Sequence, residues 1–134
     1  MATFHLQIVT PDRMVLDEDA ESIILRTVNG DVCILAHHID YAAPLGIGEA
    51  KVTKADGTER SGVCNGGLLS VNDNTVRVLA TTFEWQNEID IERARRAQNT
   101  AEEQLKKLSK RDHEYAIAEA KLKRALARIQ ASRR

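Results

Sequence analysis

The feature that most constrains the fold of this chain is an abrupt change in composition between residues 83 and 90. All seven glycines and both prolines lie at or before Gly67. Residues 1–84 contain 6 Lys+Arg against 12 Asp+Glu, a net charge of −6, whereas residues 85–134 contain 13 against 8, a net charge of +5. Because such a shift marks a domain boundary, we predict one domain over residues 1–84 and a second over residues 85–134.

Residues 1–84 have the pattern of short β-strands. From Phe4 to Ile8 apolar and polar residues alternate, which is the period of a half-buried strand. Asn29-Gly30 is the strongest short hairpin signal, because both residues accept a positive φ. Further strands are predicted at residues 22–28, 32–36, 49–54, 59–63, 68–71 and 76–82, with Asn65-Gly66-Gly67 as a tight turn. This spacing predicts an antiparallel β-sandwich or a flattened barrel.

Residues 85–134 have the pattern of two amphipathic helices. Two apolar stripes step by three and four residues: Ile91, Ala94, Gln98, Ala101, Leu105 and Leu108, then Tyr115, Ala118, Leu122, Ala125 and Ile129. Each stripe is narrow and rich in alanine, so we expect a weakly held antiparallel hairpin. The connection at residues 109–112 contains neither Gly nor Pro, so one long helix is the alternative. The predicted class is α+β, a β-sandwich followed by a two-helix hairpin, and a segment with two arrangements suits a switch.

The start of the first helix carries the most informative local signal. Asp90 suits an N-cap, and Ile89 and Ala94 suit the hydrophobic staple around it. Arg93 does not fit this interpretation, because a cation in the first turn opposes the helix dipole. A group outside the helix is therefore expected to balance that charge.

Antiparallel pairing of the helices indicates which groups lie near Arg93. A turn centred near residues 110–111 brings Arg93 opposite Arg128, and Arg124 lies one helical turn away on the same face. Three guanidinium groups then converge at the root of the hairpin, where they suit phosphate binding. The alternative is a network of arginines and carboxylates that pins the hairpin to the β domain.

Several short segments, taken in their order along the chain, carry a resemblance to a known family. The β domain contains IVTPDR at residues 8–13, GDVCILAHHIDYAAPL at 30–45 and NGGLLSV at 65–71. IDIERA at 89–94 fits the pattern (I/L)-D-x-x-R-A, and KRALAR at 123–128 supplies an arginine pair. Over essentially its whole length the chain resembles the epsilon subunit of bacterial F-type ATP synthases.

The resemblance implies a non-catalytic rotor subunit in the central stalk of a proton-translocating F-type ATP synthase. The β-sandwich would couple the gamma subunit to the membrane c-ring. The hairpin would either lie folded or extend along gamma toward the alpha and beta subunits and inhibit ATP hydrolysis, with ATP favouring the folded state. The protein would be peripheral at the cytoplasmic face of the cell membrane. A purely structural adaptor with a permanently folded hairpin that does not bind ATP is the alternative, and a stand-alone Cys or His enzyme is a further one.

The resemblance also implies a regulatory ATP site, with or without Mg²⁺, and no catalytic cofactor. Its residues are Glu84, Ile89, Asp90, Arg93, Ala94, Arg124 and Arg128. We assign the three arginines to the phosphates, the two carboxylates to the adenosine side or to orienting the arginines, and the two apolar residues to packing near the base. Asp90 can also serve as the N-cap.

The remaining conspicuous residues favour ordinary structural roles. Cys33 and Cys64 are too few for a disulfide scaffold, and without a CxxC motif we expect no metal or catalytic site. His38, Tyr41 and Pro44 are candidates for a surface that meets another subunit. No apolar run approaches the roughly 18 residues of a membrane span, so we expect no direct membrane insertion. The net charge of −1 and the lack of interleaved aromatics argue against nucleic acid as a partner.

Overall fold

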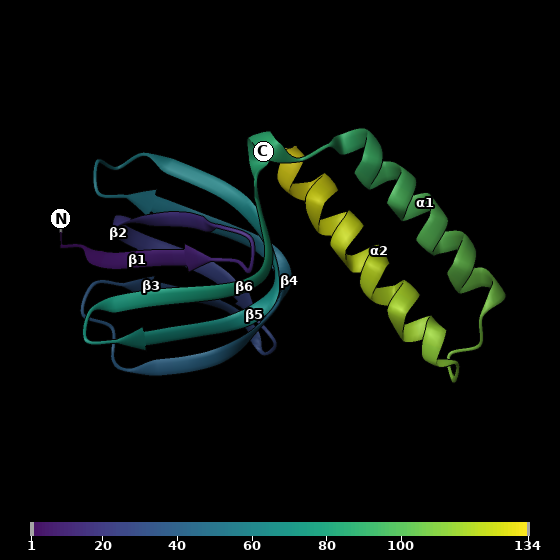
Figure 1. The fold of residues 1–134 in the computed structure, drawn as a ribbon, viewed down its shortest axis with the longest axis horizontal. Helices are drawn as coiled ribbons and strands as arrows, with labels where there is room; N and C mark the ends of the chain where they lie inside the picture. The colour runs from purple at the N-terminus through teal and green to yellow at the C-terminus, as the bar shows by residue number, and fades with distance from the viewer. Residues whose placement is uncertain (1, 134) are drawn as a thin grey trace. The chain divides into compact units, whose positions relative to one another are not determined.

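The computed structural model describes residues 2–133. In chain order its elements are β1 (Phe4–Val9), β2 (Met14–Thr27), β3 (Gly30–Leu35), β4 (Tyr41–Lys54), β5 (Glu59–Asn72), β6 (Thr75–Trp85), the 3₁₀-helix η1 (Gln86–Glu88), α1 (Ile91–Lys107) and α2 (His113–Ser132), as Figure 1 shows. The chain divides into two compact units, Met1–Trp85 and Gln86–Arg134. Trp85, which we predicted to begin the helical domain, is the last residue of β6 and is buried in the core of the first unit.

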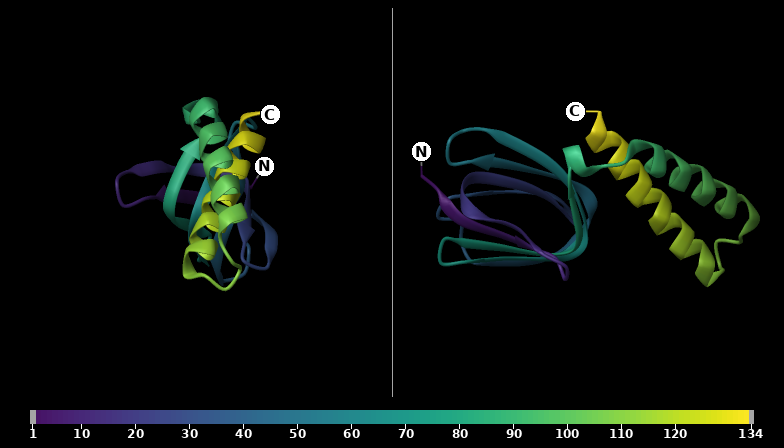
Figure 2. Two further views of the ribbon diagram at one scale, coloured as in Figure 1. Left: turned by 90° about the vertical axis from the view of Figure 1, so that its right-hand side faces the viewer. Right: turned by 45° about the horizontal axis from the view of Figure 1, so that its top comes forward.

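The first unit is a β-sandwich whose strands form two layers (Figure 2). The strand order is β1-β6-β5-β4-β2-β3, and β1 also pairs with β2, so five of the strands close on themselves. The β1–β6 pair is parallel and the other pairs are antiparallel. Alternate residues point inward and form a largely aliphatic core, which includes Leu6, Ile23, Val52 and Val78. The predicted fold class is confirmed.

Three predicted strand boundaries in the sandwich are wrong. Asn65-Gly66-Gly67 is not a turn but lies inside β5, β4 begins at Tyr41 rather than at residue 49, and β2 begins at Met14 rather than at residue 22. Gly66 and Gly67 have φ angles of +71° and +124°, yet Asn65 and Gly67 keep their partners on β6. A Cβ on Gly67 would lie 2.0 Å from the carbonyl oxygen of Leu79. Glycine is therefore required here for close approach of two strands.

The second unit is an antiparallel hairpin of α1 and α2, which lie side by side in both views (Figures 1 and 2). The buried residues of the two helices are mostly alanines: Ala94, Ala101, Ala118, Ala125, Ile129 and Ala131. The predicted seam is thus confirmed, although Ile91 at its start is 36% exposed. Among the described helices none is long and apolar enough to cross a membrane.

Side chains in the connection explain why the hairpin forms instead of one long helix. The Asp112 carboxylate accepts the backbone N–H of Ser109 at 3.0 Å, and the Ser109 hydroxyl accepts the backbone N–H of Arg111 at 3.3 Å. Short polar side chains that bond to nearby backbone compete with helical hydrogen bonds. Leu108 is accordingly extended, with φ −105° and ψ 149°, and ends α1.

Candidate functional site

Asp90 shapes the beginning of α1. Its backbone is extended, with φ −87° and ψ 99°, and its carboxylate accepts the backbone N–H of Arg93 at 3.1 Å. The first helical hydrogen bond runs from the N–H of Ala94 to the Asp90 carbonyl at 3.0 Å. Ala94 is buried and Ile89 is half-buried. Asp90 is therefore an N-cap, which satisfies one of the free N–H groups that every helix start leaves.

The three candidate arginines lie at one end of the hairpin. Arg93 is the third residue of α1, and Arg124 and Arg128 are in the last turns of α2, so antiparallel pairing places them at the same end (Figure 1). Arg93 is exposed, whereas the two arginines of α2 are half-buried. Within residues 2–133 no carboxylate lies within ion-pairing distance of Arg93 or Arg124, in contrast to Arg95, which pairs with Glu92 at 3.6 Å.

Glu84 belongs to the other unit. It lies on β6, pairs with Val63 of β5 and is half-buried. Its neighbour Trp85 packs edge-on against Phe83, with ring centroids 4.9 Å apart, and the Arg60 guanidinium lies 4.0 Å above the Trp85 ring. The sandwich therefore holds the end of β6, directly before η1, through an aromatic pair and a cation–π contact.

The structure brings two of the three predicted interface residues together. The rings of His38 and Tyr41 lie edge-on with centroids 5.8 Å apart, in the loop before β4 and at its start. The loop is held by the backbone N–H of His37, which donates to Asn74 at 2.8 Å. Pro44 points to the opposite face of β4 from Tyr41, because residues an odd number apart on a strand point to opposite faces. Its cross-strand neighbour is Leu68 of β5.

Pro44 is one end of an exposed row of apolar residues that runs across five strands. The paired residues, from β2 to β4, are Met14, Val9, Leu79, Leu68 and Pro44. Met14, Leu79 and Leu68 are 53%, 48% and 44% exposed. Since strands lie about 4.8 Å apart, the row extends about 19 Å over the sandwich surface. We call it the apolar row; contiguous exposed apolar patches are typical of interaction surfaces.

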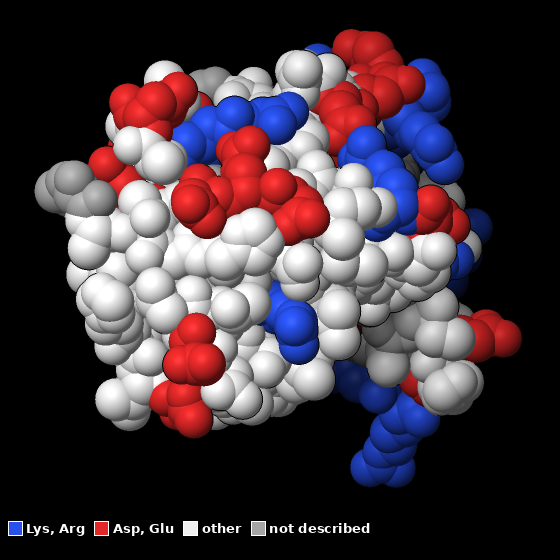
Figure 3. All heavy atoms as spheres, turned by 60° about the vertical axis from the view of Figure 1, so that its left-hand side comes forward, with Lys and Arg blue, Asp and Glu red and all other residues white. Residues whose placement is uncertain are grey.

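A polar row lies directly beside the apolar row. Its paired residues, from β2 to β5, are Asp17, Gln7, Arg77 and Ser70. The Arg77 Nε donates to Gln7 Oε1 at 3.2 Å, and the Gln7 amide donates to Asp17 at 3.4 Å. In the view of Figure 3, acidic side chains form several groups on the surface, with Lys and Arg side chains beside them. The sandwich thus presents an apolar surface beside an ordered polar one.

His5 links β1 to β2 next to the polar row. Its ring nitrogens lie 2.5 Å from Asp17 and 3.2 Å from Asp19. Hydrogen bonds to Asp19 and then Asp17 raise the pKa of His5 above 6.5, because both carboxylates favour the protonated ring.

The two cysteines are free thiols in different surroundings. Cys33 is exposed on β3, and Cys64 is buried in the sandwich. Burial raises the pKa of the Cys64 thiol to about 12, because a thiolate is poorly solvated there. In the part of the chain that the structure describes, no group of three or more His, Cys, Asp or Glu could hold a metal ion.

Both units match known protein families over nearly their whole length. Residues 3–86 match the family described as "ATP synthase, Delta/Epsilon chain, beta-sandwich domain", and residues 87–133 match "ATP synthase, Delta/Epsilon chain, long alpha-helix domain". The chain is also 41% identical over 129 residues to the "ATP synthase epsilon chain, sodium ion specific" of Propionigenium modestum, covering 96% of this chain and 93% of that protein. The chain belongs to the ATP synthase epsilon chain family.

Other epsilon chains and a solved assembly agree with this assignment. The ATP synthase epsilon chain of Ruminococcus albus is 41% identical over 130 residues, covering 96% of each chain. A chain in the mitochondrial ATP synthase structure of Euglena gracilis, comprising OSCP, F1 and the c-ring, superimposes with a TM-score of 0.85 at 25% identity, covering 100% of this chain and 83% of that one. This epsilon chain is thus a component of the ATP synthase complex and not its catalytic subunit.

Sequence reasoning found Pro44 but missed the rest of the apolar row. Val9 and Leu79 are 70 positions apart and meet only through the parallel β1–β6 pair. The alternation of inward and outward residues along each strand could have identified these residues as outward-facing. Alternation alone does not say which strands are neighbours, so it could not have shown that the residues form one row.

Proposed function

We propose that this chain is the rotor subunit of the central stalk in a proton-translocating F-type ATP synthase, where its sandwich binds the gamma subunit and the c-ring. The apolar row is the observation that carries the proposal, because exposed leucines in register across neighbouring strands favour burial by a partner. We assign the row to gamma. The complex would hold the protein peripherally at the cytoplasmic face of the membrane.

Assembly of the full chain with purified gamma subunit tests this proposal. Leu68→Asp and Leu79→Asp each place a charge in the middle of the row, and we expect either change to abolish stable binding to gamma. Leu35→Asp is the matched control, since Leu35 is 57% exposed on β3, outside the row, and should leave binding unchanged. Normal binding by both row variants would refute the role of the row.

The hairpin supports a regulatory function in addition. We propose that ATP binds Arg93, Arg124 and Arg128 with its phosphates, near Asp90, Ile89 and Ala94, and favours the paired helices. Two features support this: Arg93 and Arg124 lack a carboxylate partner among residues 2–133, and the seam is built largely from small alanine side chains. A ligand that contacts both helices can shift such an equilibrium, since a tenfold preference corresponds to about 1.4 kcal/mol. Opening would let the arm reach the alpha and beta subunits and inhibit ATP hydrolysis.

Calorimetric titration of the full chain with ATP, with and without Mg²⁺, tests the regulatory proposal. We expect saturable one-to-one binding that is lost in Arg93→Ala and in Arg128→Ala. Arg95→Ala is the matched control, because Arg95 is on the same helix but pairs with Glu92. If the chain does not bind millimolar ATP, the hairpin is a structural adaptor and its arginines serve another purpose. Glu84→Gln tests whether that carboxylate contributes.

A further inference from the structure

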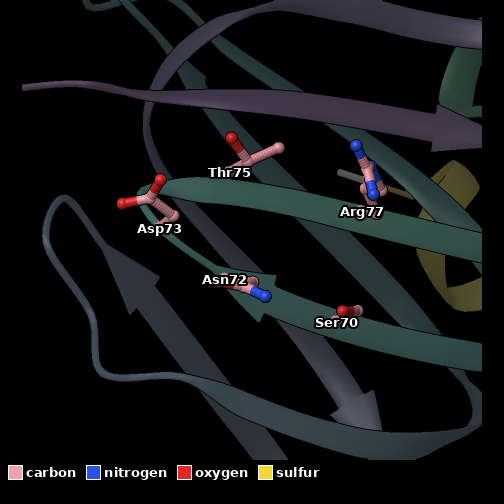
Figure 4. Close-up of a pocket in the computed structure, with 5 residues that line it drawn as sticks. All are labelled: Ser70, Asn72, Asp73, Thr75 and Arg77. Atoms are coloured by element: carbon pink, nitrogen blue, oxygen red, sulfur yellow. The ribbon is translucent and has the colours of Figure 1, made fainter.

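A polar hollow adjoins the apolar row at the end of the sandwich where β5 turns into β6. It has a volume of about 310 Å³ and is lined by Ser70, Asn72, Asp73, Thr75 and Arg77 (Figure 4). Ser70 and Arg77 face each other across the two strands, each two residues beyond the leucine of the apolar row on its strand. The hollow therefore continues the same surface that the row occupies.

Most hydrogen-bond donors of the side chains that line the hollow are available to a ligand. The Arg77 Nε is held by Gln7, which is itself held by Asp17, so the guanidinium has a defined orientation. Toward other residues within 2–133 the Arg77 guanidinium makes no further hydrogen bond or ion pair, and the hydroxyls of Ser70 and Thr75 make none. A guanidinium has five N–H donors in a planar fork, and most of these remain available.

We propose that this hollow binds the carboxylate of one Asp or Glu side chain on the subunit that covers the apolar row. The inference rests on the proposed function of that row. A partner that buries Leu79 also removes water from Arg77, two residues along β6, and a cation that loses water without gaining an anion is costly. A carboxylate matches the guanidinium fork in two parallel hydrogen bonds and can accept further ones from Ser70 and Thr75.

The charge of the hollow favours a single carboxylate over a phosphate. Asp73 lies at the turn end of the hollow, and Arg77 at the end that meets the apolar row (Figure 4). Because Asp73 already supplies one negative charge to the hollow, a divalent phosphate would be repelled more strongly than a monovalent carboxylate bound at the Arg77 end. The partner surface is therefore apolar with one acidic side chain at its margin.

Binding of the full chain to the gamma subunit tests the inference when the row and the hollow are changed separately. Arg77→Gln removes the charge but keeps a hydrogen-bonding amide, and we expect it to weaken binding about tenfold or more, mostly through faster dissociation. Arg77→Lys should recover only part of this loss, because an ammonium cannot form the paired bonds. Arg26→Gln is the control, since Arg26 is also exposed on the sandwich but pairs with Asp31 at 2.6 Å.

The outcomes separate the inference from the proposed function. If Leu68→Asp abolishes binding while Arg77→Gln binds like the unchanged protein, the hollow does not bind a carboxylate and the row still stands. If Leu68→Asp and Leu79→Asp also bind normally, the proposed function of the row is refuted as well. A double-mutant cycle of Arg77→Gln with each Asp and Glu of gamma, changed to Asn or Gln, should reveal one strongly coupled carboxylate. Weakened binding without such a coupled residue would overturn the inference.

Discussion

Replacement of Gly67 by alanine should destabilise the sandwich far more than the same replacement at Gly30. The two glycines have nearly equal φ angles, +124° and +119°, so the cost of a side chain at positive φ, about 1–3 kcal/mol, is similar at both. The loss of chain entropy in the unfolded state is also the same, because both changes are Gly→Ala. The difference between the two variants therefore isolates the surroundings of the new Cβ.

Those surroundings differ completely. At Gly30 a Cβ meets no atom within 4 Å, whereas at Gly67 it lies 2.0 Å from the Leu79 carbonyl oxygen and 2.9 Å from the Ala80 Cα. Both are backbone atoms, so relief requires β5 and β6 to separate by more than 1 Å, judged against an ordinary contact of about 3.4 Å. Overpacking of this kind costs about 1–3 kcal/mol, and we expect the free energy of unfolding of Gly67→Ala to lie below that of Gly30→Ala by an amount in this range.

Urea unfolding followed by Trp85 fluorescence measures this difference, because Trp85 is 3% exposed in the sandwich core and reports on that unit. The free energies of unfolding are compared at equal m-values. Equal stability of the two variants, within about 0.5 kcal/mol, would refute the argument that close approach of the strands requires Gly67. The gamma-binding assay adds a functional measurement, since displacing Leu79 should also disturb the apolar row.

Three further predictions concern the rest of the chain. The pKa of His5 is raised above 6.5 in the folded state. Its hydrogen bonds to Asp19 and Asp17 therefore stabilise the folded protein fully below pH 6.5, and this stabilisation is lost as the pH rises through the raised pKa. His5→Gln should therefore lower the free energy of unfolding more at pH 5.5 than at pH 8.5. The difference should be less than about 1 kcal/mol, because the ring is half-exposed. An equal loss of stability at both pH values, measured by urea unfolding, would contradict this prediction. Asp112→Ala removes the hydrogen bond from the Ser109 N–H and should loosen the connection between the helices, seen as faster amide hydrogen exchange at residues 109–112; unchanged exchange there would count against the role of that bond. In the native protein a thiol reagent should modify Cys33 rapidly and Cys64 only on unfolding, and early labelling of Cys64 would contradict its burial.

Local signals in the sequence predicted local structure well. Asp90 begins α1 as an N-cap, and the hairpin between β2 and β3 turns at residues 28–29, with Gly30 at a φ of +119° as the first residue of β3. Both features depend on interactions between residues no more than four positions apart. The alanine seam of the helices was predictable for the same reason, since helical periodicity puts those residues on one face.

Non-local pairing explains where sequence reasoning failed. Asn65-Gly66-Gly67 has the composition of a turn, but Gly67 serves the approach of β5 to the Leu79 backbone, which no nearby residue reveals. Likewise Pro44, Gly46 and Gly48 argue against a strand, yet β4 runs through all three. Strand partners on both sides can override weak local propensity.

The sequence by itself determined the order of the two units, the two amphipathic helices and the family to which the chain is similar, but it left a hairpin and one long helix both open. Each of these follows from composition, periodicity or motifs that lie within a short stretch of chain. Only the tertiary structure decided which surface the sandwich presents. The apolar row and the hollow beside it exist because register aligns residues from strands that are far apart in sequence, including the parallel pairing of Val9 with Leu79. A shift of β1 by one residue in that register would turn Val9 to the opposite face and break the row.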